Sequence, residues 1–231
     1  FTGGARPGTA PPDRNPMPPG GKRVLFVSDS SFADIRWAGT RGSLTGAEFD
    51  LRLESCRRLI GVSCRGREGY TAPTALSEVR SVTPGTVDVL VMGTGYNDHA
   101  SQFRSGFAQV MSAARDAGIE RVVWITYREP VTYRSPSELS NAATFAANNH
   151  VLRAAAASGA WPELRLLDWH AHTLDSTGWL APDGVHFTAA GALEATLFVS
   201  RALAHDDRRP CGPHGGHTEP GGWCADPTGK R

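Results

Sequence analysis

Five short apolar runs, separated by longer stretches with helical character, are the feature that most constrains the fold of this chain. The runs span Arg23–Ser28, Phe49–Glu54, Val87–Met92, Arg121–Thr126 and Leu164–Asp168. Three of them are almost continuous Val, Leu, Ile and Trp, a pattern typical of strands that are covered on both faces. Helices are expected at about Pro73–Ser81, His99–Ala117, Pro136–Ser158 and Thr188–His205. Strands that alternate with helices predict an α/β fold with a central parallel sheet of about five strands between two helical layers.

The composition narrows the class of protein. The chain has 231 residues, of which 40% are hydrophobic and 20% are charged, so one packed domain is expected rather than disorder. The formal net charge is +1, which argues against nucleic acid as the main ligand because phosphate binding needs a basic surplus. No run of about 18 uncharged apolar residues occurs, so no membrane span is predicted.

The two ends differ from the centre in composition. Residues 1–21 are rich in Pro and Gly and are interpreted as a linker or a surface tail. Residues 22–207 form the predicted folded domain, and residues 208–231 form a Gly/Pro-rich C-terminal tail. The chain begins at Phe1 without Met, so we interpret it as a processed or trimmed piece. Its Pro-rich start is compatible with attachment to a larger membrane or cell-envelope protein.

The cysteines occur as two close pairs, Cys56/Cys64 and Cys211/Cys224. An even number at short spacing predicts two local disulfides in an oxidising compartment, hence a secreted or extracytoplasmic protein. Each disulfide would stabilise the fold by about 2–3 kcal/mol in the chain-entropy model. Cys64 as a catalytic thiol is less favoured.

For the second pair, the interpretation that competes with a disulfide is a zinc site built from Cys211, His214, His217 and Cys224. Their spacing matches no common zinc pattern, so the disulfide is preferred.

Polar side chains gather where the predicted strands end, which is where parallel sheets bind ligands. The segments concerned are Ser28–Ser31, Ser63–Gly69, Gly93–Asp98 and, late in the chain, Trp179–Phe187. Together they supply a hydroxyl, an imidazole, a carboxylate three residues before that imidazole, and polar donors. Acyl transfer needs this set, because a serine requires a base, the base requires an orienting carboxylate, and the oxyanion requires hydrogen-bond donors.

In order and in strand context, these residues resemble the four blocks of the SGNH (GDSL-like) serine hydrolases. The matching features are Asp29-Ser30 after the first strand, a glycine after the second, Gly95-x-Asn97 after the third, and Asp183-x-x-His186. The resemblance covers about Arg23–His205. It implies a flavodoxin-like three-layer α/β/α sandwich and the hydrolysis or transfer of O-acyl groups without a metal or other cofactor.

The resemblance also assigns roles. Ser30 would be the nucleophile, His186 the general base and acid, and Asp183 its orienting partner. The oxyanion donors would be the Ser30 N–H, the Asn97 amide and the N–H of Gly66, with Gly69 as the alternative glycine. The family's Gly-Asp-Ser is Ser28-Asp29-Ser30 in this chain, so the turn must accept an extra side chain.

Structural interpretations compete with these roles. Ser30 is also a plausible helix N-cap, Ser31 is a less favoured nucleophile, and Asn97 or Asp98 is expected to cap the following helix, Asp98 more so. Two other motifs are disfavoured. The third glycine of a dinucleotide-binding G-x-G-x-x-G loop is replaced by Asp98, whose carboxylate would repel a pyrophosphate. No G-x-S-x-G elbow, the mark of an α/β-hydrolase, occurs.

The sequence therefore predicts a secreted or cell-envelope serine esterase that acts on short-chain or O-acetyl esters of glycans, lipids or small alcohols. One alternative is an O-acyltransferase that passes the acyl group to a glycan or lipid hydroxyl. An alternative of another class is a catalytically silent carbohydrate-binding module. A serine-reactive fluorophosphonate would label either enzyme at Ser30 and would not label the binding module.

Overall fold

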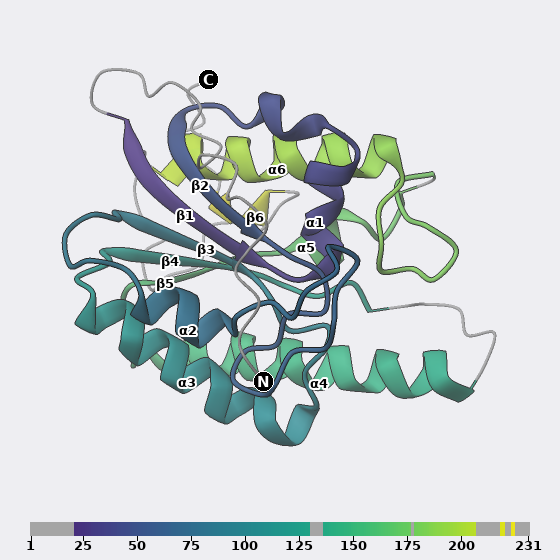
Figure 1. Cartoon of the computed structure of the whole chain (residues 1–231), viewed down its shortest axis with the longest axis horizontal. Coiled ribbons are helices and arrows are strands. Elements are labelled where there is room, and N and C mark those ends of the chain that lie inside the picture. The colour runs from purple at the N-terminus through teal and green to yellow at the C-terminus, as the bar shows by residue number, and fades with distance from the viewer. Residues whose placement is uncertain (1–20, 130–135, 177, 207–217, 220–222, 225–231) are drawn as a thin grey trace.

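A five-stranded parallel sheet in the order β2-β1-β3-β4-β5 forms the centre of the molecule (Figure 1). The computed structural model describes residues 21–129, 136–176, 178–206, 218–219 and 223–224. The strands are β1 (Lys22–Ser28), β2 (Ala47–Leu53), β3 (Val89–Gly93), β4 (Arg121–Ile125) and β5 (Leu164–Leu167). All five predicted strands are present, and the strand order is that of flavodoxin-like sheets. The α/β/α prediction is confirmed.

Helices cover both faces of the sheet (Figure 1). They are α1 (Ser30–Trp37), α2 (Ala75–Arg80), α3 (Ala100–Asp116), α4 (Pro136–Ser158), α5 (Trp169–His172) and α6 (Ala189–Asp206), with a 3₁₀ helix η1 at Thr40–Ser43. Leu25 and Val27 of β1 face a core shared with α2, α3 and α4, whereas Val24 and Phe26 face a core shared with α1 and α6. Because successive side chains of a strand point to opposite faces, one apolar run supplies both cores.

Helix α1, like η1 and α5, is not among the helices predicted from hydrophobic periodicity. It is short and directly follows the polar Ser28-Asp29 step, so its sequence is compatible with a turn. Asp29 is its N-cap, and the carboxylate accepts a hydrogen bond from the Ser31 N–H. The cap begins the helix two residues after β1 ends, which places Ser30 at the carboxyl edge of the sheet.

The chain ends lie mostly outside the described residues, so the predicted tails and domain boundaries stay predictions. Two short strands, β6 (Thr218–Glu219) and β7 (Trp223–Cys224), pair antiparallel within the C-terminal segment. Cys211 lies outside the described residues, and the predicted Cys211–Cys224 disulfide and its zinc alternative remain untested. Among the helices that the structure describes, none combines the length and apolarity needed to cross a membrane.

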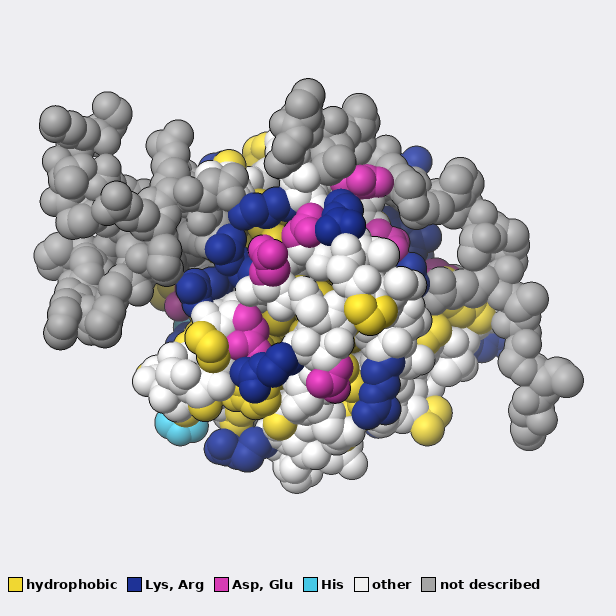
Figure 2. Space-filling view, turned by 90° about the vertical axis from the view of Figure 1, so that its left-hand side faces the viewer, with side chains coloured by type: hydrophobic (Ala, Val, Ile, Leu, Met, Phe, Trp, Pro, Cys, Tyr) yellow, Lys and Arg dark blue, Asp and Glu magenta, His cyan; other side chains and the backbone are white. Residues whose placement is uncertain are grey.

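The opposite end of the sheet, where the strands begin, carries mixed charge. Arg23 at the start of β1 forms a 2.5 Å ion pair with Asp88, just before β3. Figure 2 shows basic and acidic side chains interspersed over this end of the molecule.

Candidate active site

Asp29 joins the first block to the third. Its carboxylate is fully buried. One oxygen accepts the Ser31 N–H and hydroxyl at 3.1 and 2.8 Å, and the other accepts the N–H groups of Gly95 and Tyr96, both at 3.0 Å. Burial raises the pKa of Asp29, and these hydrogen bonds oppose that shift by stabilising the carboxylate. The loop after β3 is therefore fixed against the start of α1, where Ser30 stands.

Ser28 replaces the glycine of the family pattern, and the neighbouring strand makes room for it. Its side chain is buried. A Cβ atom built at Gly93, its partner in β3, would lie 2.8 Å from the Ser28 hydroxyl oxygen, so this position in β3 requires glycine. The Ser28 side chain thus fits because its partner in β3, Gly93, has no side chain. The turn from β1 into Ser30 is kept.

The loop after β2 contacts the first and third blocks through Arg57. The Ser28 carbonyl accepts the Glu54 N–H at 3.2 Å and Nε of Arg57 at 3.1 Å. The Arg57 carbonyl in turn accepts Nδ2 of Asn97 at 3.2 Å. The loops after β1, β2 and β3 are therefore joined to one another. One N–H of the Asn97 amide makes this bond, which leaves the other available to a ligand.

The conformation of the third block depends on a close backbone approach. Gly95 has φ +150°, and a side chain there would collide with the Tyr127 hydroxyl. That hydroxyl donates to the Thr94 carbonyl at 2.7 Å. Only glycine fits this position, which explains the first residue of the Gly95-x-Asn97 motif.

The fourth block contains a histidine–carboxylate pair. Nδ1 of His186 lies 2.6 Å from Oδ2 of Asp183, and Oδ1 of Asp183 accepts the N–H groups of Val185 and His186 at 2.9 and 3.0 Å. The bond to His186 holds the pKa of Asp183 well below its usual range, and the same bond raises the pKa of His186. A deprotonated carboxylate can only accept, so Nδ1 carries the proton and Nε2 is free to act as a base.

This loop is fastened to the helix that begins at Ser30. The Phe187 N–H donates to Oδ2 of Asp34 at 2.6 Å, and the rings of Phe187 and Phe32 meet edge to face at 5.1 Å. Burial raises the pKa of Asp34. The residue after His186 thus binds α1 one helical turn beyond Ser30. Asp34 was not singled out from the sequence. Its spacing of four from Ser30 places both on one helix face and is the available signal.

Both glycines expected to complete the oxyanion hole use their N–H groups elsewhere. Gly66 donates to the Tyr70 carbonyl at 2.9 Å, and Gly69 donates to the Gly66 carbonyl at 3.0 Å. They close a small turn next to the Arg65–Thr71 bridge. The prediction of Gly66, with Gly69 as its alternative, therefore does not match the observed hydrogen bonding.

The expected capping roles of Asn97 and Asp98 are also wrong. His99 is the N-cap of α3, and it makes no side-chain capping bond. The Asp98 carboxylate instead accepts the Leu59 N–H at 3.1 Å, and burial raises its pKa to about 7. The Asn97 and Asp98 side chains therefore bind the backbone of the loop after β2 and do not cap α3.

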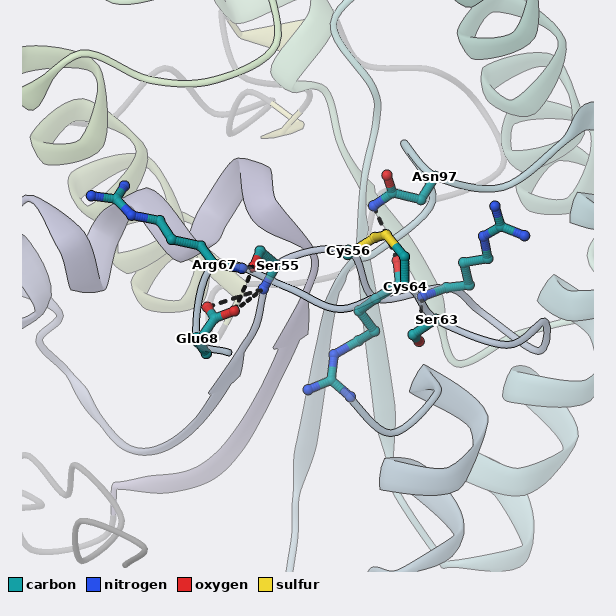
Figure 3. Close-up of a disulfide and its surroundings, with 9 residues drawn as sticks. Ser55, Cys56, Ser63, Cys64, Arg67, Glu68 and Asn97 are labelled. Carbon is teal, nitrogen blue, oxygen red and sulfur yellow. Dashed lines mark hydrogen bonds between the residues drawn. A yellow bond between two sulfur atoms is a disulfide. The ribbon is translucent and has the colours of Figure 1, made fainter. Parts of the chain in front are cut away.

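The predicted disulfide between Cys56 and Cys64 is present, with Cα atoms 5.4 Å apart. It closes the loop that leaves β2 and lies beside Asn97 (Figure 3). This pairing excludes Cys64 as a free catalytic thiol in the structure.

Comparison with known proteins gives structural neighbours only. No family profile matches the chain, and no curated protein matches its sequence. A protein assigned to the SGNH hydrolases from Slackia heliotrinireducens matches with a TM-score of 0.54 and 21% identity, covering 79% of this chain and 99% of its own. A carbohydrate esterase family 3 protein from Talaromyces cellulolyticus matches with a TM-score of 0.50 and 17% identity, covering 80% and 97%.

A mutant of an acetyl-xylooligosaccharide esterase from Geobacillus also matches, with a TM-score of 0.52 and 12% identity, covering 83% of this chain and 98% of its own. At these identities the likeness concerns the fold. All three neighbours are covered almost completely, so the shared part is the whole domain rather than a common fragment. The chain therefore has the α/β/α fold of the SGNH hydrolases.

Proposed function

We propose that this protein is a serine esterase that hydrolyses short O-acyl esters through an acyl-enzyme on Ser30. The observation that carries the proposal is the fourth block. A histidine bonded to a carboxylate at 2.6 Å is fastened, through the next residue, to the helix on which Ser30 is the first residue. The Ser30 hydroxyl makes no hydrogen bond to any residue that the structure describes, as a nucleophile awaiting its substrate would.

In the proposed first half-reaction, Nε2 of His186 takes the proton from the Ser30 oxygen as that oxygen attacks the ester carbonyl carbon. Asp183 stabilises the imidazolium that results. The carbonyl electrons move onto oxygen, where the Ser30 N–H and the Asn97 amide donate to the oxyanion. When the intermediate collapses, His186 returns the proton to the departing alcohol, and the acyl group stays on Ser30.

In the second half-reaction, water enters where the alcohol left. His186 removes a proton from that water, the hydroxide oxygen bonds to the acyl carbon, and a second tetrahedral intermediate forms. Its collapse breaks the ester to Ser30, returns the proton to the serine and releases the carboxylic acid. Residues of this chain perform every proton transfer in the cycle.

The substrate class that we propose is O-acetyl groups on glycans. Two proteins with this fold are described as a carbohydrate esterase and as an acetyl-xylooligosaccharide esterase, which supports this class. The Cys56–Cys64 disulfide supports an oxidising, extracytoplasmic compartment, where such glycans occur.

The proposal is tested by measuring acid release from p-nitrophenyl acetate, butyrate and octanoate and from acetylated xylo-oligosaccharides. We expect turnover of the acetyl substrates, with rates that fall as the acyl chain lengthens. A second series supplies sugar acceptors and measures transfer products against free acetate. No turnover of any ester would refute the proposed function, and transfer exceeding hydrolysis would favour the acyltransferase.

Asn97→Ala tests the side-chain oxyanion donor. We expect kcat to fall about 10²–10³-fold with little change in KM, because the amide is expected to stabilise charge that is present only in the transition state. The control is Asn141→Ala, an exposed asparagine of α4. A loss of less than about threefold would mean that Asn97 serves only to hold the Arg57 carbonyl.

The pH dependence of kcat/KM tests the base. His186 must be neutral to accept the serine proton, and its raised pKa means that activity increases with pH through a midpoint above 6.5, its ordinary value. Asp34 contributes to that rise through its negative charge, so Asp34→Asn should move the midpoint to lower pH. Asp116→Asn, at the far end of α3, is the matched control. An unmoved midpoint in Asp34→Asn would contradict this arrangement.

A further inference from the structure

Cys56 has a backbone conformation that is unusual for its residue type. Its φ is +61°, and among the residues that the structure describes it is the only non-glycine residue with a positive φ. This left-handed region costs an ordinary L-residue a factor of about 5–30 in population. Residues persist there only where their surroundings impose the conformation, and such residues cluster at functional sites.

The surroundings of Cys56 do impose it. Its sulfur is bonded to Cys64 across the loop. On one side, the Ser55 N–H donates to Glu68 at 3.1 Å, and the Ser55 hydroxyl also bonds Glu68. On the other side, Arg57 has a fully buried side chain. Both neighbours in sequence are fixed, and the disulfide fixes the residue between them (Figure 3).

Cys56 also directly precedes the residue that joins the loops after β1, β2 and β3. It lies three residues after the end of β2, and Arg57, the next residue, bonds the Ser28 carbonyl with Nε and the Asn97 amide with its own carbonyl. Figure 3 shows Asn97 lying against the Cys56–Cys64 disulfide. The Cys56 N–H makes no hydrogen bond to any described residue, in contrast to the N–H groups of Gly66 and Gly69.

We propose that the Cys56 N–H is the missing main-chain donor of the oxyanion hole, and that the Cys56–Cys64 disulfide holds it in the catalytic conformation. This inference rests on the proposed esterase function. Glycine would adopt the same φ without penalty, whereas cysteine at this position depends on the cross-link. Catalysis would therefore depend on the disulfide through the backbone of residue 56 and not through sulfur chemistry.

Three double variants separate these possibilities: Cys56→Gly, Cys56→Asn and Cys56→Ala, each combined with Cys64→Ala. All three lack the disulfide to the same extent and leave Cys211 and Cys224 unchanged, and they differ in how readily residue 56 adopts a positive φ. Glycine does so freely, asparagine moderately and alanine poorly. We measure kcat and KM with p-nitrophenyl acetate, together with the melting temperature of each variant.

We expect C56G/C64A to keep kcat within about threefold of the wild type, and C56A/C64A to lose about 5- to 30-fold at unchanged KM, the factor by which the left-handed region is disfavoured. C56N/C64A should fall between them, and it replaces the alanine variant if that one does not fold. Equal kcat in the glycine and asparagine variants, or a loss shared equally by all three, would overturn the inference while wild-type turnover leaves the esterase proposal intact. Absence of turnover in the wild type would instead refute both.

Discussion

Ser30→Ala is expected to lower kcat for acetyl esters by at least about 10⁴-fold, because the oxygen that would receive the acyl group is lost. The residual rate would come from water attacking an ester that is still bound between the oxyanion donors. The fold should be unaffected. Asp29 is the N-cap of α1, and the Ser30 hydroxyl makes no hydrogen bond to a described residue, so it contributes little to stability.

The measurement pairs kinetics with covalent labelling. Wild-type protein should react with a fluorophosphonate at a single serine, and peptide mapping should identify Ser30. The control is Ser31→Ala, which removes a hydroxyl bonded to Asp29 at 2.8 Å. That variant should still be labelled and should lose much less activity. Labelling at Ser31, or turnover retained in Ser30→Ala, would remove Ser30 from the role proposed for it.

Among the substitutions described, Arg57→Met is expected to destabilise the protein most, lowering the free energy of unfolding by about 3–5 kcal/mol. The Arg57 guanidinium is fully buried and pairs with Glu54 at 2.5 Å and with Glu78 at 3.1 Å. It also donates to the Pro73 carbonyl at 2.5 Å. Methionine fills similar volume and carries no charge, so Glu54 would lose its buried ionic partner and Glu78 would keep only its pairing with Arg52 of the two ion pairs described. For a domain of this size, that loss corresponds to roughly 6–20 °C in melting temperature.

The matched control is Arg115→Met, which breaks the ion pair between α3 and Glu163. Arg115 is 53% exposed, and solvent-exposed pairs contribute about 0–1 kcal/mol. Thermal unfolding followed by circular dichroism would give both values. If Arg57→Met lowered the melting temperature no more than Arg115→Met does, the buried contacts of Arg57 with Glu54 and Glu78 would not stabilise the fold as proposed.

The parts of the fold that could be predicted are those set by local pattern. Buried parallel strands such as β3 and β4 need continuous apolar residues, and the motif residues Ser30, Asn97 and His186 follow strands or precede a helix at readable positions. The carboxylate three residues before His186 could be paired with it because the intervening turn is short. Contacts that depend only on spacing along the sequence could therefore be predicted without the structure.

The remaining parts depend on contacts between distant segments. No local pattern reports that Asp34 accepts the Phe187 N–H, or that Asp98 accepts the Leu59 N–H. The positive φ of Cys56 arises from a disulfide and from fixed neighbours, whereas sequence rules expect glycine at such positions. The family resemblance implies a glycine N–H as oxyanion donor, but the sequence does not report that the Gly66 N–H closes a turn with the Tyr70 carbonyl.

The bond between Phe187 and Asp34 spans 153 residues of sequence. During synthesis on the ribosome, Ser30 emerges well before His186. In the proposed mechanism, a nascent or prematurely terminated product that ends before His186 would therefore lack the base. The proposed activity would then be confined to products that extend through His186, since shorter ones would carry the proposed nucleophile without the means to activate it.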